Sequence, residues 1–182
     1  MAIDACNENI YRQIKGGNYE SKINLLKQCA EKFPNRISTH LIVGLGETEE
    51  EIIKIIDSMH RVNISVGLFA FNPVRGTKLE KCTSPHISTY RRVQIANYLL
   101  KNKFIKFENL KFEKNKLVKI NIDKQNVLEK LMDGKAFETP GCPGCNRPYY
   151  TEKPGGTMYN YPKKLTSQQL DMAIKESELQ II

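Results

Sequence analysis

Residues 37–43 form an apolar, strand-like run that passes through a Gly-Leu-Gly turn into a helical pattern, and this feature constrains the fold most. Thr48, followed by Glu51 three residues later, has the pattern of a capping box, which marks the start of a helix. Apolar residues then recur at helical spacing as far as Met59. A strand, a glycine turn and a helix in this order are typical of α/β proteins, which bind ligands at such turns.

The glycine turn lacks the sequence of a dinucleotide-binding loop. Gly44 and Gly46 supply the first two glycines of G-x-G-x-x-G, but the third is absent. The helix start is crowded by four carboxylates, those of Glu47, Glu49, Glu50 and Glu51. Carboxylates suit the positive end of a helix dipole but repel a pyrophosphate, so the turn predicts a ligand that is not a polyanion.

Strands and helices alternate over residues 1–104. The patterns predict, in order, strand 1–5, helix 20–33, strand 37–43, helix 48–61, strand 64–71 and helix 88–101. Strands that alternate with such helices pair in parallel through right-handed crossovers. Because a complete (β/α) barrel takes about 250 residues, we expect an α/β fold with a partial (β/α) barrel of about three strand–helix units.

Three parallel strands and their helices would leave part of the sheet uncovered. Parallel strands are apolar on both faces, so one face and one edge would have no partner. We therefore expect the chain to be the C-terminal part of a larger protein, or to need a partner subunit that supplies the missing N-terminal half-barrel.

The pattern changes after the strand–helix region, so we divide the chain into residues 1–104 and a C-terminal extension of residues 105–182. Residues 107–122 alternate apolar and charged side chains around a polar turn, which predicts an antiparallel hairpin. Asp123 is placed to cap a short helix. An amphipathic pattern over residues 167–178 predicts a last helix that packs back on the body.

Composition narrows the classes of function. The chain has 28 basic and 20 acidic residues and a net charge of +8, but the lysines are scattered, so a nucleic-acid partner is not favoured. The sequence contains neither an apolar run of the roughly 18 residues that a membrane helix needs nor a signal peptide, so we expect a cytoplasmic protein with no membrane partner. Five cysteines, an odd number, argue against a disulfide framework.

Cys142-Pro143-Gly144-Cys145 is the strongest chemical signal, because two thiolates two residues apart can reach one metal. Iron–sulfur ligands, a zinc clip, and a redox pair or plain buried thiols all remain open. A redox pair normally opens a helix, whereas Asn146-Arg147-Pro148 does not continue as one. The other metal ligands have to come from a histidine, from the missing half, or from Cys6, Cys29 or Cys82. Of these, Cys29 falls on the apolar side of a predicted helix, so we expect it in the core rather than at a metal.

Two further groups of side chains have both an ordinary and a functional interpretation. His40 lies in the middle of an apolar strand, on the face opposite to Thr39 and Leu41, and we expect a hydrogen-bonded core residue there rather than a ligand. An aromatic cluster in the C-terminal loop can stack nucleobases or can pin the loop to the body, and we favour pinning. The cluster consists of Tyr149, Tyr150, Tyr159 and Tyr161.

The chain contains, in this order, the segments MAIDACNENIYRQIKGG, THLIVGLGETEEEI, LFAFNPVRGTKLE, YRRVQIANYLL and GKAFETPGCPGCNRPYYTEKPGGTMYNYP. Together these segments resemble radical S-adenosylmethionine (SAM) enzymes of the biotin-synthase-related group. THLIVGLGETEEEI is similar to their fifth barrel strand and the following loop, and MAIDACNENIYRQIKGG to the preceding strand and helix. LFAFNPVRGTKLE resembles their sixth strand and loop, and YRRVQIANYLL the helix after it. GKAFETPGCPGCNRPYYTEKPGGTMYNYP is similar to a tail found in archaeal biotin-synthase-like and lipoyl-synthase-like members.

The resemblance implies a C-terminal part of an iron–sulfur enzyme with SAM and a 4Fe-4S cluster as cofactors. In such enzymes SAM is cleaved reductively and the resulting radical abstracts hydrogen from the substrate. Biotin-synthase-like and lipoyl-synthase-like members then insert sulfur into a small-molecule or carrier-bound substrate. Cys142 and Cys145 are implied as ligands of an auxiliary cluster.

The same resemblance implies the residues that bind the cofactor. Gly44, Gly46 and Glu47 correspond to the turn that contacts the adenosyl part of SAM. Asn72 and Arg75, in the next loop, would offer an amide and a guanidinium to the substrate or to the methionine carboxylate. The ordinary interpretation is a turn residue before a proline for Asn72 and a surface side chain for Arg75.

One family motif is missing from the 182 residues. The Cys-x3-Cys-x2-Cys sequence that holds the SAM-binding cluster in that superfamily does not occur, so this chain alone is not expected to cleave SAM. Two alternatives from other classes therefore stay open. One is a non-catalytic zinc-clip module that binds RNA or serves as an accessory, and the other is a remnant without activity.

Overall fold

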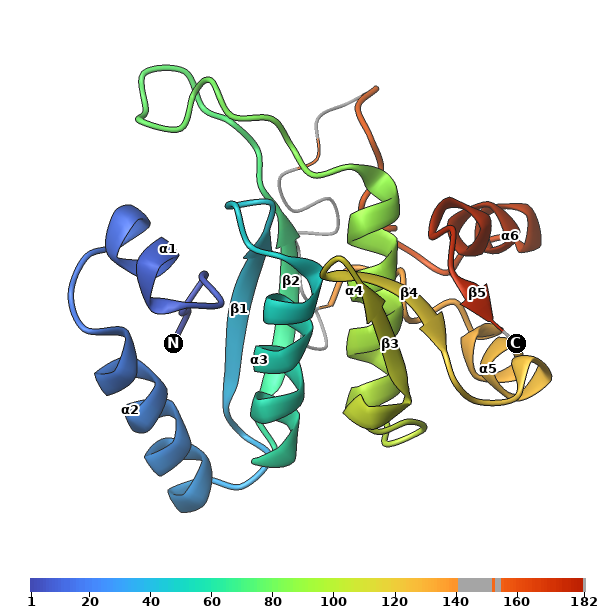
Figure 1. Cartoon of the computed structure of the whole chain (residues 1–182), viewed down its shortest axis with the longest axis horizontal. Helices are drawn as coiled ribbons and strands as arrows, with labels where there is room; N and C mark the ends of the chain where they lie inside the picture. The colour runs from blue at the N-terminus through green and yellow to red at the C-terminus, as the bar shows by residue number, and fades with distance from the viewer. Residues whose placement is uncertain (141–151, 153–154, 182) are drawn as a thin grey trace.

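The computed structural model describes residues 1–140, 152 and 155–181. The elements, in chain order, are α1 (Glu8–Ile14), α2 (Tyr19–Lys32), β1 (Ser38–Val43), α3 (Glu49–Arg61), β2 (Ser65–Ala70), α4 (Ile87–Lys101), the 3-10 turn η1 (Phe107–Asn109), β3 (Leu110–Glu113), β4 (Lys116–Ile120), α5 (Lys124–Leu131), α6 (Ser167–Glu176) and β5 (Gln180–Ile181). Figure 1 shows α1 and α2 at one end of the molecule, the C-terminal elements at the other, and β1, β2, α3 and α4 between them.

The first sheet consists of β1 and β2, which pair in parallel as predicted. The predicted strand at residues 1–5 is wrong in its extent, because only Asp4 bridges β1, opposite Leu41. Asp4 has a φ of 61°, and the N–H of Ala5 turns back to the carbonyl oxygen of Ile3. The backbone at Asp4 is therefore left-handed, and the extended conformation ends there.

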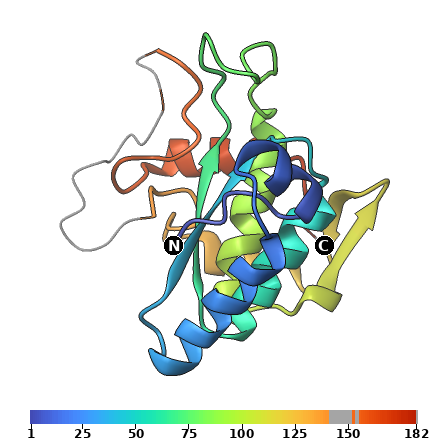
Figure 2. The same ribbon diagram turned by 90° about the vertical axis from the view of Figure 1, so that its left-hand side faces the viewer.

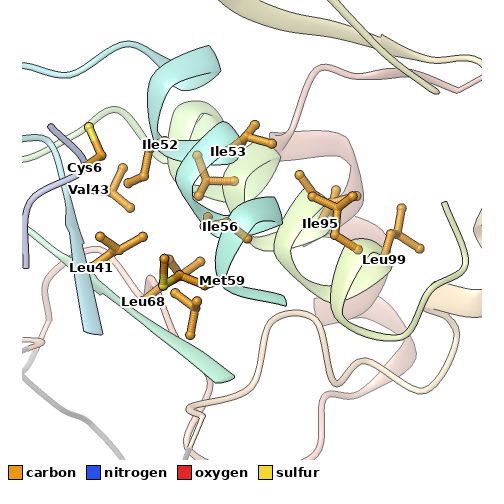
Figure 3. Close-up of a cluster of buried hydrophobic side chains, with 14 of the residues drawn as sticks. Cys6, Leu41, Val43, Ile52, Ile53, Ile56, Met59, Leu68, Ile95 and Leu99 are labelled. Carbon is orange, nitrogen blue, oxygen red and sulfur yellow. The ribbon is translucent and has the colours of Figure 1, made fainter. Parts of the chain in front are cut away.

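Helix α3 covers one face of this sheet. Figure 3 shows strand side chains and helix side chains meeting across this interface, and six of them are at most 2% exposed: Leu41, Val43, Leu68, Ile52, Ile56 and Met59. Burying an aliphatic side chain of this size contributes about 1.5–3 kcal/mol. The apolar side of α3, which the pattern after the glycine turn predicts, thus makes the main packing contact of the first sheet.

None of the helices in the described ranges covers the opposite face of the sheet. His40 is exposed on it, and the ring of His40 meets the ring of Phe69 edge-on with centroids 5.1 Å apart. The predicted alternation is confirmed, since Thr39 and Leu41 are buried on the other side. The expectation that His40 is a core residue is wrong, because helices cover only the Thr39 side of this strand.

Helix α4 is the central helix of the molecule. It packs against β2 and α3 on one side and against α6 on the other, and side chains all round it are buried. His86 is its N-cap and accepts a hydrogen bond from the N–H of Ser88.

The C-terminal extension has the elements that the patterns predict. β3 and β4 form an antiparallel hairpin whose turn residues, Lys114 and Asn115, both have positive φ, as the commonest two-residue hairpin turns require. Asp123 caps α5, and α6 packs on α4. The two-residue strand β5, which pairs in parallel with β4, is too short to give a sequence pattern.

The described residues form a mixed α/β structure with sheets of two and three strands and no closed barrel, so a partial barrel is not confirmed. Residues on both sides of position 104 contribute to one hydrophobic core, for example Leu68 and Leu99 on one side and Leu117 and Val127 on the other. Within the described ranges, none of the helices is both long enough and apolar enough to cross a membrane.

Candidate functional site

The carboxyl ends of β1 and β2 lie side by side because the strands are parallel. The turn at residues 44–47 follows β1, and a long loop, residues 71–86, follows β2. Figure 2 shows this loop rising above the strand ends. Open α/β sheets bind ligands outside the carboxyl ends of their strands, so this edge is the candidate site.

The side chain of Glu47 accepts hydrogen bonds from the backbone of its own glycine turn. One carboxylate oxygen accepts the N–H of Gly44 at 2.6 Å and the other accepts the N–H of Leu45 at 2.9 Å. Gly44 and Gly46 have φ of 101° and 108°, a region open to glycine but not to other residues. A Cβ on Gly46 would meet no heavy atom within 4 Å. The turn is therefore ordered by its own carboxylate and presents bare backbone at Gly46.

Two of the other glutamates at the helix start also have structural partners. Glu51 completes the predicted capping box with Thr48 and accepts the side-chain amide of Asn7 at 3.1 Å. Hydrogen bonds from Thr48 lower the pKa of Glu51. Glu49 is buried, which the sequence did not indicate. The carboxylates thus build the turn and the helix start, in addition to making this region unsuitable for a polyanion.

Glu49 is held by an ion pair at the centre of the molecule. Its carboxylate receives the Nε and Nη2 groups of Arg92 at 2.8 and 2.6 Å and the backbone N–H of Leu117 at 2.9 Å. Arg92, only 2% exposed, also donates to the carbonyl oxygen of Ser177 at 2.8 Å. The start of α3, and with it the glycine turn, is thereby fixed by α4, β4 and the segment after α6.

Sequence reasoning did not single out Arg92. The signal was its helical spacing, since Ala96 and Leu99 lie four and seven residues further on and both are fully buried. Arg92 therefore shares one side of α4 with these residues, although side chains on all sides of this helix are buried.

Two hollows flank the candidate edge. The open-face hollow, about 400 Å³, lies over the uncovered side of the sheet and is lined by residues that include Asp4, His40, Ile42, Phe69 and Asn72. The turn hollow, about 360 Å³, lies between the glycine turn and the following loop, and its lining includes Gly44, Gly46, Leu79 and Cys82. Phe71 lines both, so the two hollows adjoin.

The structure brings most of the predicted cofactor residues to this edge. Gly44 and Gly46 line the turn hollow, and Asn72, half-buried, lines the open-face hollow. The carboxylate of Glu47 faces the backbone of its own turn. Arg75 is exposed on the loop, and neither hollow includes it among the lining residues that the structure describes.

The edge fits SAM in size and chemistry. Small-ligand sites usually measure about 300–1,000 Å³ and combine apolar walls with a few polar groups. The open-face hollow has the walls of Ile42 and Phe69 and the polar groups of Asp4, His40 and Asn72, with no lysine or arginine among its described lining residues. A nucleoside with a net positive charge, such as SAM, suits this lining better than a polyphosphate does.

The described residues do not themselves supply an iron–sulfur site. Cys142 and Cys145 lie outside them. Cys6 is buried, Cys29 is half-buried and Cys82 is exposed, and no group of three His, Cys, Asp or Glu side chains suited to a metal occurs in the described part of the chain.

Cys6 is predicted to be chemically inert. Burial raises its pKa to about 12, and the nearby carboxylates of Glu47 and Glu51 act in the same direction. Because the thiolate is the reactive form, we expect iodoacetamide at about pH 8 to label Cys82 and to leave Cys6 unlabelled until the chain is unfolded. Peptide mapping by mass spectrometry measures both in one sample. Equal labelling of the two cysteines in the folded chain would contradict the burial of Cys6.

The tyrosines that the structure describes pin the C-terminal segment. The hydroxyl of Tyr159 donates to the carbonyl oxygen of Pro85 at 2.7 Å, and its ring meets the ring of Tyr90 edge-on at 5.0 Å. The guanidinium of Arg91 lies 5.4 Å from the ring centre of Tyr161. The pinning interpretation is supported for these two side chains, whereas Tyr149 and Tyr150 lie outside the described residues.

Comparison with known proteins gives short local matches. The chain is 40% identical to a lipoyl synthase of Haemophilus influenzae over 52 residues, which is 28% of this chain and 16% of that protein. It is 28% identical to the ribosomal protein uS12 methylthiotransferase RimO of Alteromonas mediterranea over 97 residues, 51% of this chain and 20% of that protein. An uncharacterized protein of Methanocaldococcus jannaschii is 28% identical over 88 residues, 45% of this chain and 23% of that protein.

These matches span less than a quarter of the length of each relative. No protein-family model matches the chain, and no solved structure does. Lipoyl synthases and this methylthiotransferase are radical SAM enzymes, so the partial matches support a relationship between this chain and the radical SAM enzymes.

Proposed function

We propose that the chain is the C-terminal part of a radical SAM iron–sulfur enzyme, biotin-synthase-like, that carries out radical-mediated sulfur insertion of the biotin or lipoate type. The relatives named above support this chemistry at the level of the family. The observation that carries the proposal is the carboxyl edge of β1 and β2, where the glycine turn and Asn72 border two adjoining hollows of small-ligand size.

In this proposal the turn hollow and the open-face hollow together hold SAM. Gly44 and Gly46 admit the adenosyl part, since the bare backbone at Gly46 leaves room for a close approach. Glu47 positions the turn by binding its N–H groups, and Asn72 offers an amide to the amino-acid part. Arg75, on the exposed loop, would reach the substrate or the methionine carboxylate. The chemistry that SAM would supply there, after one-electron reduction by a 4Fe-4S cluster and cleavage of its S–C5′ bond, is a radical that abstracts hydrogen from the substrate.

The open face of the sheet supports a larger assembly. Ile42, Phe69 and Phe71 are only partly buried on it, and the described helices cover the other face. Covering such apolar surface contributes about 25 cal/mol for each Å² removed from water. We therefore propose that a half-barrel, from the same polypeptide or from a partner subunit, packs on this side and encloses a small-molecule or carrier-bound substrate.

A cluster reconstitution tests the proposal. Anaerobic addition of iron and sulfide to this chain is expected to give a brown protein with visible absorption, and Cys142→Ser or Cys145→Ser is expected to abolish most of that absorption. Cys29→Ser, which alters a half-buried thiol on α2, is the matched control and is expected to retain it. Tight binding of zinc with no colour under these conditions would refute the iron–sulfur assignment and favour the zinc clip.

A further inference from the structure

A third hollow lies beyond the carboxyl end of β2, between this strand end and the C-terminal segment. It measures about 300 Å³, and its lining includes Phe71, Asn72, Ser84, Glu152, Thr157 and Tyr159. Phe71 and Asn72 also line the open-face hollow, so this C-terminal hollow adjoins the candidate site.

Glu152 carries a carboxylate oxygen that has no partner among the described residues. Its Oε1 accepts two hydrogen bonds from Asn160, from the backbone N–H at 2.8 Å and from Nδ2 at 3.0 Å. Its Oε2 is buried and makes no hydrogen bond within the described part of the chain. A buried acceptor of this kind, above all a charged one, is costly unless a donor reaches it.

The carboxylate of Glu152 is held from behind by buried polar groups. Asn160, 2% exposed, exchanges hydrogen bonds with the hydroxyl of Tyr90 and accepts the side-chain amide of Gln94 at 3.1 Å. Tyr90 and Gln94 belong to the central helix, and both are at most 2% exposed. Glu152 is therefore positioned by the rigid part of the molecule and not by the loop alone.

The residues that line the C-terminal hollow favour a positively charged ligand. It contains no lysine or arginine among the described residues, whereas Asn72, Ser84 and Thr157 add polar oxygens. The rings of Phe71 and Tyr159 complete the walls, and aromatic faces attract organic cations. No group of three metal-ligating side chains occurs in the described part of the chain, so these residues lack the set of ligands that a metal ion needs.

We propose that the C-terminal hollow binds an organic ammonium group, with Glu152 as its acceptor. An ammonium brings the N–H donors that Oε2 lacks, and a hydrogen bond between two charged groups is stronger than one between neutral groups. The donor reaches Oε2 after a small rotation of the carboxylate about its terminal bond, a torsion with a broad minimum. The source of the ammonium rests on the proposed function: it is the amino-acid end of SAM or an amine-bearing substrate.

Two probes of similar shape, one charged and one uncharged, test whether the hollow of the unmodified chain prefers a cation. NMR spectra of the ¹⁵N-labelled chain are recorded with n-butylamine, which is protonated at neutral pH, and with uncharged n-butanol. We expect butylammonium to shift the amide signals of Gly156 and Thr157 and to bind at least tenfold tighter, a difference of about 1.4 kcal/mol. Equal binding of the two probes, or unchanged amide signals, would overturn the proposal.

Glu152→Gln tests the acceptor. Glutamine keeps an oxygen for Asn160 but puts an amide NH₂ in the place of Oε2, so affinity for butylammonium is expected to fall at least tenfold. Glu31→Gln, on the exposed surface of α2, is the control and is expected to leave affinity unchanged. Unchanged affinity in Glu152→Gln would refute the role of this carboxylate. The probe comparison above decides the question even where this variant does not fold.

L-Methionine distinguishes the two sources, because it carries the ammonium and carboxylate of the amino-acid end of SAM. Tighter binding of methionine than of butylammonium assigns the hollow to the cofactor, and the reverse assigns it to an amine-bearing substrate. Neither probe involves a cluster. If the chain binds butylammonium but forms no Cys142-dependent cluster, the result contradicts the proposed function and leaves the ammonium site standing. If the chain forms such a cluster but binds neither probe, the result contradicts only the ammonium site.

Discussion

Arg92→Met is expected to lower the free energy of unfolding by about 3–5 kcal/mol, because it leaves the buried carboxylate of Glu49 without its cation. Arg92 is 2% exposed and Glu49 is 8% exposed, and two of their hydrogen bonds are 2.6 and 2.8 Å long. The loss also removes the donor to the carbonyl oxygen of Ser177. Urea denaturation followed by circular dichroism measures the change.

Two further variants separate burial from charge in that experiment. Arg12→Met breaks an ion pair with Glu8 in which both side chains are at least half exposed, and it is expected to cost no more than about 1 kcal/mol. Combining Arg92→Met with Glu49→Leu removes both buried charges and is expected to recover part of the stability. A loss of under about 1 kcal/mol in Arg92→Met alone would show that the pair is not buried in solution.

Gly44→Ala is expected to cost more stability than Gly46→Ala, although the two residues have nearly the same backbone. Their φ angles are 101° and 108°, so an L side chain is strained by about 1–3 kcal/mol at either position. At Gly44 a Cβ would also lie 2.9 Å from Cδ of Pro85, which is shorter than a van der Waals contact. This overpacking adds about 1–3 kcal/mol.

Gly46→Ala is the matched control, because its Cβ would meet no heavy atom within 4 Å. The difference between the two unfolding free energies in urea isolates the contact with Pro85. Equal losses would mean that the loop of residues 71–86 does not rest on the glycine turn as the structure shows.

The sequence predicts the fold best where a single local pattern determines the local structure. The capping box at Thr48, the alternation in β1 and the hairpin turn at Lys114 and Asn115 are all local signals, and all are confirmed. The strand expected at the amino end is reduced to Asp4, because a left-handed backbone at that residue gives no signature in an apolar run. His40 was misplaced because strand alternation gives two faces but does not say which of them is covered.

The sequence predicts where the candidate site lies, but it does not predict the hydrogen bonds and ion pairs that the carboxylates make there. The glycine turn and the next loop do meet at one edge, since parallel strands bring their carboxyl ends together. That Glu47 binds its own turn and that Glu49 pairs with Arg92 depends on contacts with residues 2 to 43 positions away. The position of Glu152 depends on Asn160 and on the helix residues Gln94 and Tyr90, which lie 58 and 62 residues earlier in the chain, a relation that spacing cannot reveal.

The buried pair of Glu49 and Arg92 also bears on how the polypeptide can be divided. Its partners, the N–H of Leu117 and the carbonyl oxygen of Ser177, both come after residue 104. A protein cut between residues 104 and 105 would expose two charged side chains that now lie in the interior, together with the apolar side of α4. The two fragments are therefore expected to be soluble and folded only when they are produced together.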